Sequence, residues 1–171
     1  MKISNTRIIE LLGIFGVVAS LVFVGMQLML DRRIAIADQY QARTELRMQI
    51  LLGQFENDGF IRDFAARWET NRPNWWNAEV ENAFVEFDVS MAFLFRLTIS
   101  REMYLITMDN NYYQYQQGLL EQSVWDGMRE VLGRSERNSM LRAFSQGLNL
   151  PSLNEVIDEI STEIQYENQT P

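Results

Sequence analysis

The sequence has no cysteine and no histidine, and its only lysine is Lys2. Without thiols it forms no disulfide, no iron–sulfur cluster and no cysteine-ligated zinc site. Without imidazole it forms no Ser-His-Asp triad and no histidine-bound metal or haem. The folded region beyond Lys2 also lacks the lysine of a P-loop. We therefore expect no catalysis, no cofactor and no bound metal.

Positive charge is scarce as well, because 15 basic residues stand against 23 acidic ones and the net charge is −8. The only charged residues up to position 30 are Lys2, Arg7 and Glu10, so the acidic excess lies in the rest of the chain. An acidic domain repels phosphate backbones, and the sequence has no dense run of basic residues. Nucleic acid is therefore not an expected partner.

What the sequence does contain is an uncharged apolar run at residues 11–30, LLGIFGVVASLVFVGMQLML. At about 1.5 Å per residue this helix spans roughly 30 Å, the thickness of the hydrocarbon core of a bilayer. Core helices of soluble proteins seldom run this long without a charge. A cleaved signal peptide is disfavoured by Glu10 and by the lack of an A-x-A site after the run. We expect a single transmembrane helix, with the lipid bilayer as its surroundings.

Small and polar residues form a stripe along this run. Steps of three and four residues place them on one helix face: Gly13, Gly16, Ser20, Phe23 and Gln27. Gly16 and Ser20 would let a second helix approach closely, and Gln27 would form a hydrogen bond across the contact. In the alternative, the glycines are ordinary members of a spanning helix and Gln27 lies near interfacial water. Both interpretations stay open.

Beyond the anchor the pattern is helical throughout, with no strand alternation or repeat. We expect an all-α fold in which the N-terminal transmembrane helix continues into a stalk, followed by an irregular helical bundle. The expected regions are a tail and anchor at 1–30, a helical stalk at 31–55 that ends near Gly53, and a helical domain at 56–171. The expected helices of the domain cover about 59–70, 78–117, 123–133, 136–146 and 152–166. Their expected capping residues are Asp58, Asn74 or Asn77, Gly118, Ser123 and Ser152.

Aromatic residues mark two candidate sites. Tyr112, Tyr113 and Tyr115 offer aromatic faces with polar tips, which suit a ligand or partner groove. In the alternative they are structural, with Tyr113 packed inward. Trp75 and Trp76 are candidates for membrane-interface anchors, or for a plug at one end of the bundle.

Acidic residues cluster near the start of the expected helix 78–117, at Glu79, Glu81, Glu86 and Asp88. Paired carboxylates can transfer protons or bind hard cations. However, no calcium-loop pattern is present, and acidic residues near a helix N-terminus are favoured by the helix dipole alone. A solvated face is therefore the preferred interpretation.

Two segments resemble an uncharacterised family of bacterial proteins with one N-terminal transmembrane helix and a helical domain of unknown function. The first is IIELLGIFGVVASLVFVGMQL at residues 8–28, followed by RRIAIADQYQAR. The second is EMYLITMDNNYYQYQQGLLEQSVWDG at residues 102–127. The resemblance implies a helical protein of the bacterial inner membrane, and it implies no activity or catalytic residue.

These features together predict a non-enzymatic membrane-anchored scaffold or accessory subunit that acts through helix-mediated assembly. Its expected partner is a second copy of the chain or another membrane protein. The alternative is a small-ligand-binding or sensory domain that uses the tyrosine-rich segment. Positive charge is retained on the cytoplasmic side of a membrane, so the flanking charges predict a cytoplasmic C-terminal domain. Those charges are Lys2 and Arg7 before the run, and Arg32, Arg33, Arg43 and Arg47 after it.

Overall fold

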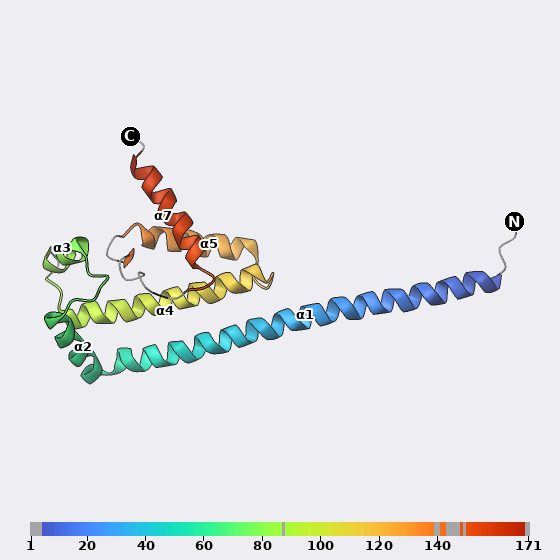
Figure 1. The fold of residues 1–171 in the computed structure, drawn as a ribbon, viewed down its shortest axis with the longest axis horizontal. Coiled ribbons are helices and arrows are strands. Elements are labelled where there is room, and N and C mark those ends of the chain that lie inside the picture. Colours follow the sequence, from blue (N-terminus) through green and yellow to red (C-terminus); the bar gives the residue numbers. More distant parts are fainter. Residues whose placement is uncertain (1–4, 87, 139–140, 143–147, 149, 170–171) are drawn as a thin grey trace. The chain divides into compact units, whose positions relative to one another are not determined.

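The structure, a computed structural model, describes residues 5–86, 88–138, 141–142, 148 and 150–169. Within these residues it contains helices and no strand, so the predicted all-α class is confirmed (Figure 1). The described helices are α1 (Asn5–Glu56), α2 (Asp58–Thr70), α3 (Ala78–Glu86), α4 (Met91–Gln116), α5 (Gln122–Glu136) and α7 (Asn154–Gln169).

The chain divides into two compact units, an N-terminal unit at Met1–Gln39 and a C-terminal unit at Tyr40–Pro171. Helix α1 contributes to both of them. Residues 40–55, the C-terminal part of the expected stalk at 31–55, therefore belong to the compact C-terminal unit.

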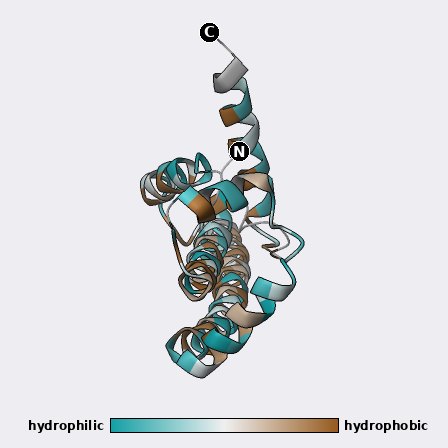
Figure 2. Ribbon diagram, turned by 90° about the vertical axis from the view of Figure 1, so that its left-hand side faces the viewer, coloured by the Kyte–Doolittle hydropathy of each residue, from teal (hydrophilic) through white to brown (hydrophobic). Residues whose placement is uncertain are grey.

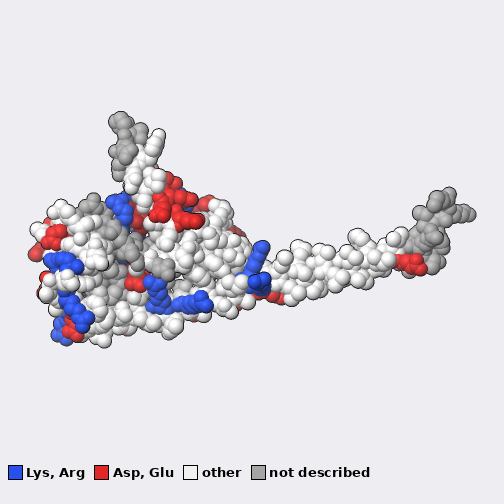
Figure 3. Space-filling model, viewed as in Figure 1, with Lys and Arg blue, Asp and Glu red and all other residues white. Residues whose placement is uncertain are grey.

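The N-terminal unit is an apolar helix whose side chains face outward. Every residue from 10 to 36 is exposed. The large apolar side chains of the run range from 49% exposed at Val24 to 73% at Phe15. Figure 3 shows this stretch as an uncharged rod with charged residues at both ends. By length and composition it is the one helix in the described part of the chain that is able to cross a membrane.

Helix α4 organises the core of the C-terminal unit, because α2 and α5 both pack against it and α7 packs on α5. The main cluster takes buried residues from five helices, among them Leu51, Ile61, Leu105, Leu132 and Ile160. Helix α7 is amphipathic, and Figure 2 shows hydrophobic bands along a mainly hydrophilic helix. Its buried side chains recur every four residues, so one face is apolar and the other is solvated.

A second, smaller cluster lies around Val80, Met91 and Leu94, with Trp75 and Trp76 packed against it. The ring of Trp75 meets Trp68 edge-on at 5.3 Å, and the ring of Trp76 meets Phe84 edge-on at 5.6 Å. The two tryptophans therefore have a packing role inside the C-terminal unit.

The expected single helix over 78–117 is wrong, because α3 ends at Glu86 and α4 begins at Met91. Ser90 caps α4 by accepting a hydrogen bond from the Phe93 N–H at 3.1 Å. Asp88 has φ +47°, in the left-handed region that Asp tolerates better than most residues. The apolar spacing continues across this break, so periodicity alone could not show it.

Several expected helix ends also needed correction. Helix α1 passes through Gly53 to Glu56, since one glycine weakens a helix without ending it. Asn57, and not Asp58, caps α2, because its side chain accepts from the Phe60 N–H at 3.0 Å. Helix α5 begins at Gln122 without a side-chain cap and continues past Gly133 to Glu136, so the expected cap at Ser123 is wrong.

Two predicted caps are confirmed. Asn77 accepts a hydrogen bond from the Val80 N–H at 2.9 Å at the start of α3. Gly118 follows α4 with φ +72°, and its N–H donates to the Tyr115 carbonyl at 2.9 Å. The Leu119 N–H donates to the Gln114 carbonyl at 3.0 Å, which completes a Schellman motif. Most of the helix expected at 136–146 lies outside the described residues.

A buried ion pair joins α4 to α5. Arg101 donates to Glu136 through Nη2 and to Ser135 Oγ through Nη1, the latter at 3.1 Å. The two charged side chains are 3% and 0% exposed. Burial lowers the pKa of Arg101, and the charge of Glu136 opposes that effect. The two buried charges therefore neutralise each other inside the unit.

We expect Glu136→Gln to lower the free energy of unfolding by about 3–5 kcal/mol, because it removes the carboxylate charge that pairs with the buried guanidinium. Urea unfolding of the full chain in detergent measures this. The control is Glu163→Gln, which removes an exposed partner of Arg129 at 2.8 Å and should cost less than about 1 kcal/mol. Equal losses in the two variants would contradict this account of the pair.

Candidate functional site

The carboxylate of Asp109 lies at the centre of a polar site in the C-terminal unit. Asp109 projects from α4 and is 5% exposed. Its Oδ1 accepts hydrogen bonds from the backbone N–H groups of Ser152 at 2.9 Å and Leu153 at 2.8 Å. Helix α7 begins directly after them, at Asn154. The expected capping box at Ser152 is therefore wrong, because a carboxylate from α4 binds these N–H groups.

The side chain of Tyr40, on α1, binds the same carboxylate. Its hydroxyl donates a hydrogen bond to Asp109 Oδ2, and its ring stacks on Tyr113 with centroids 4.4 Å apart and planes at 9°. Burial, and next the hydrogen bond to Asp109, raise the pKa of Tyr40 to about 12. Tyr40 is therefore a protonated donor at neutral pH.

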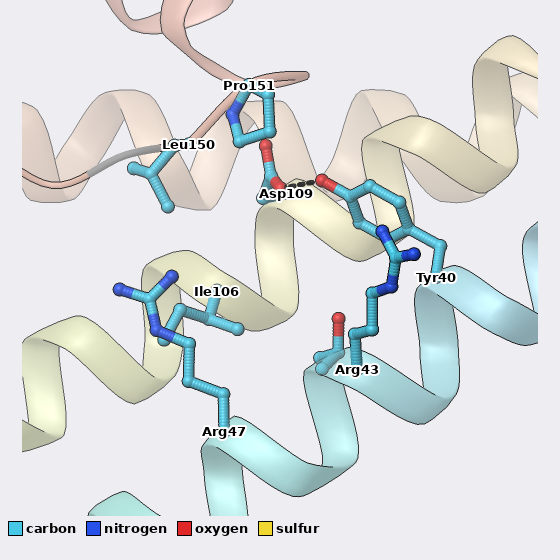
Figure 4. Close-up of a pocket in the computed structure, with 8 residues that line it drawn as sticks. Tyr40, Arg43, Arg47, Ile106, Asp109, Leu150 and Pro151 are labelled. Carbon is cyan, nitrogen blue, oxygen red and sulfur yellow. Dashed lines mark hydrogen bonds between the residues drawn. The ribbon is translucent and has the colours of Figure 1, made fainter.

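A partly open groove of about 220 Å³ lies beside this contact, within the C-terminal unit (Figure 4). Its walls come from α1, α4 and the turn before α7. The lining residues are Tyr40, Arg43, Thr44, Arg47, Ile106, Asp109, Leu150 and Pro151.

The α1 wall of the groove is polar and cationic. Its four residues are spaced as i, i+3, i+4 and i+7, which places them on one helix face. Figure 4 shows Arg43 and Arg47 extending from α1 toward the level of α4 and the turn. Arg47 Nη2 donates to Glu102 Oε1 at 2.8 Å. Within the described part of the chain, no carboxylate forms an ion pair with Arg43.

The chemistry of the groove suits binding more than proton transfer. Tyr40 holds its proton far above neutral pH, so it is a poor acid and no base there. The oxygens of Asp109 already accept three hydrogen bonds. Guanidinium and hydroxyl donors remain on one side, and Ile106, Leu150 and Pro151 supply an apolar side.

The three tyrosines of the predicted groove do not line one surface, because they take part in two separate ring contacts. Tyr113 stacks on Tyr40 beside the polar site. Tyr112 and Tyr115 instead pack on Trp125, with ring centroids 4.6 and 5.8 Å away. All three tyrosines are half-buried and in ring contact within the C-terminal unit. Their rings therefore help to hold the helices together.

The predicted helix–helix stripe lies in the N-terminal unit and is exposed along its length, at Gly13, Gly16, Ser20, Phe23 and Gln27. A Cβ atom added at either glycine would meet nothing within 4 Å. The Ser20 hydroxyl donates to the Gly16 carbonyl at 2.9 Å, so it is satisfied within its own helix. The stripe is thus a smooth, uncovered face of the described chain.

One member of the acidic cluster, Glu81, has partners within the chain. Glu81 accepts a hydrogen bond from the indole N–H of Trp76 at 2.5 Å and lies 3.8 Å from Arg72. Within the residues whose side chains are described, no group of three or more acidic residues is arranged to hold a metal ion. The side chain of Glu79 lies outside those residues.

Sequence reasoning missed the residues that build the polar site, above all Tyr40 and Asp109. The spacing of polar residues on α1 could have indicated part of this site. One face of the segment interpreted as a stalk holds four of them: Tyr40, Arg43, Thr44 and Arg47. Asp109 gave no such signal, since its hydrogen-bond partners lie 43, 44 and 69 residues away along the chain.

Comparisons of the chain with protein-family models, with curated proteins and with solved structures found no match. The family resemblance of residues 8–28 and 102–127 therefore stays a hypothesis.

We expect Tyr40→Phe to destabilise the protein by about 1.5–3 kcal/mol, the range for a hydrogen bond to a charged group. The raised pKa of Tyr40 means that this stability is complete below pH 10 and is lost as the pH rises toward about 12. Urea unfolding of both proteins at several alkaline pH values measures the difference, which should shrink over that window. Tyr166→Phe is the control, because Tyr166 is 73% exposed. A difference that is constant with pH would count against the hydroxyl bond.

Proposed function

We propose that this chain is a single-pass membrane protein of the bacterial inner membrane that acts, without catalysis, as a helical scaffold or accessory subunit. In this proposal its apolar helix assembles with a second protein helix, from another copy or from a membrane partner. The observation that supports the proposal most directly is the continuous exposure of the apolar run in α1.

A membrane location is supported by the free energy that it would cost to expose this apolar run to water. Each large apolar side chain of the run would gain about 1.5–3 kcal/mol by leaving water. The C-terminal unit has a core of its own and does not need this helix to complete it. A lipid environment removes the cost, because a helix satisfies all its backbone groups internally.

Assembly is supported by the shape of the exposed stripe. At about 100° per residue, Gly13, Gly16, Ser20, Phe23 and Gln27 fall within an arc of about 80°. Lipid tails already satisfy apolar surface, so small residues gain only where another helix backbone comes close. The inward hydrogen bond of Ser20 keeps its hydroxyl from obstructing such an approach.

The alternative function, small-ligand binding or sensing through the tyrosine-rich segment, has less support. The rings of two of its three tyrosines pack on Trp125, and the ring of the third stacks on Tyr40. Rings that are stacked within the chain have less free surface for a ligand. The anchor stripe, in contrast, is entirely free in the described chain.

We expect the full-length protein to stay with membranes after a carbonate wash, and a chain that begins at Asp31 to be released. The basic residues after the run, including Arg32 and Arg33, lead us to propose a cytoplasmic C-terminal domain. A phosphatase fused to the C-terminus should therefore be inactive. Recovery of the intact protein as a soluble monomer would refute the anchor, and an active fusion would reverse the orientation.

We expect the double substitution of Gly16→Leu and Ser20→Leu to weaken self-association or partner binding, because leucines hold the two backbones apart. Crosslinking in membranes and native mass in detergent measure this, while carbonate resistance should be unchanged. The matched control is Gly25→Leu with Val18→Leu, which adds similar bulk on the opposite face. If the protein is monomeric before and after substitution, or if both double variants behave alike, the stripe has no role in assembly.

A further inference from the structure

We propose that the groove between α1 and α4 is a binding site for a small organic acid, whose carboxylate is held by Arg43 and Thr44. The apolar part of the acid lies against Ile106, Leu150 and Pro151. The inference goes beyond the proposed assembly and does not depend on it, because every residue that supports it lies in the C-terminal unit.

The charged side chains around the groove are paired within the described part of the chain, except for one cation, Arg43, which can bind an external anion. The carboxylate of Asp109 is bound by the Tyr40 hydroxyl and two backbone N–H groups. The carboxylate of Glu102 is bound by Arg47 at 2.8 Å. Arg43 has no carboxylate partner within the described residues, and a guanidinium binds a carboxylate through two parallel N–H donors.

The geometry places the remaining donors together. Arg43 and Thr44 are neighbours on the α1 wall, and both line the same groove. Figure 4 shows Arg43 and Tyr40 extending from the same helix, α1, on the side of the groove opposite Leu150 and Pro151. An anion bound at Arg43 and Thr44 would accept hydrogen bonds from the guanidinium and the hydroxyl.

Size and polarity select the class of anion. A volume of about 220 Å³ is below the range of roughly 300–1,000 Å³ found for drug-sized ligands, so the groove suits a smaller acid. The opposite wall is apolar at Ile106, Leu150 and Pro151, which suits a short hydrocarbon and not a second charge. These features favour a monocarboxylate over phosphate, which carries more charge and no apolar part.

The test uses the full-length protein in detergent, titrated calorimetrically with butyrate, acetate and inorganic phosphate at constant ionic strength. We expect saturable butyrate binding that is tighter than binding of acetate, which leaves the apolar wall empty, and of phosphate, which has no apolar part. Butyrate should also raise the unfolding temperature, because it binds only the folded state.

Variants then locate the site. Arg43→Gln should weaken butyrate binding by at least about tenfold, because it removes the charged partner. Thr44→Val keeps the side-chain shape and should weaken it by a smaller factor. The matched control is Arg62→Gln, an exposed arginine of α2 outside the groove, which should bind butyrate as the unchanged protein does. Unfolding temperatures without ligand verify that each variant is folded.

Three results would overturn the proposal. One is the absence of saturable binding for every acid. Another is butyrate binding that survives both Arg43→Gln and Thr44→Val in folded protein, or that falls equally in Arg62→Gln. The last is phosphate binding tighter than butyrate, which would assign the groove to a different class of anion.

Discussion

The carboxylate of Asp109 is the contact on which the arrangement of the C-terminal unit depends. It receives the Tyr40 hydroxyl from α1 and two backbone N–H groups from the turn before α7. Leu153 is completely buried, so its N–H could not turn to water if this acceptor were absent. An unsatisfied buried donor costs about 1–3 kcal/mol, which is a large share of the stability of a small domain. One side chain of α4 thus fixes where α7 begins and where α1 joins the unit.

The contacts between α1 and α4 have a common character, since long polar side chains make many of them. Tyr40 meets Asp109 and Tyr113 at one end, and Arg47 meets Glu102 further along, so the two helices run antiparallel. Long side chains reach across the space between two helix backbones, whereas small apolar residues would draw the backbones together. The groove beside Tyr40 follows from this choice of residues, because the space between the helices is only partly filled. Arg43 and Thr44 lie on the same face of α1 as Tyr40 and Arg47, and they provide the groove with its remaining donors.

The sequence predicted those features that depend on neighbouring residues. The apolar run, the helical class, the Asn77 cap and the Gly118 C-terminal motif all follow from local patterns of hydrophobicity, side-chain oxygens and glycine. The break between α3 and α4 was missed because Val80, Met91 and Leu94 keep a helical spacing across it, although they pack together as one cluster of two helices. The roles of Asp109, Tyr40, Arg101 and Glu136 could not be predicted, because each depends on a partner far away in the chain. Ser152 shows the same limit. The sequence has a capping-box pattern there, but the backbone N–H groups before α7 donate to the carboxylate of Asp109, which is distant in the chain.

Electrostatics links the acidic composition of the chain to the ligand class assigned to the groove. A net charge of −8 repels anions at long range, and a polyanion such as a nucleic acid meets that repulsion along its whole length. A small monoanion meets much less of it, because its single charge is neutralised as soon as it pairs with Arg43. At physiological ionic strength the repulsion is screened over about 8 Å, whereas contact with a guanidinium occurs at hydrogen-bond distance. The surrounding acidic charge therefore disfavours ligands with several negative charges, and contact with Arg43 favours a ligand with one.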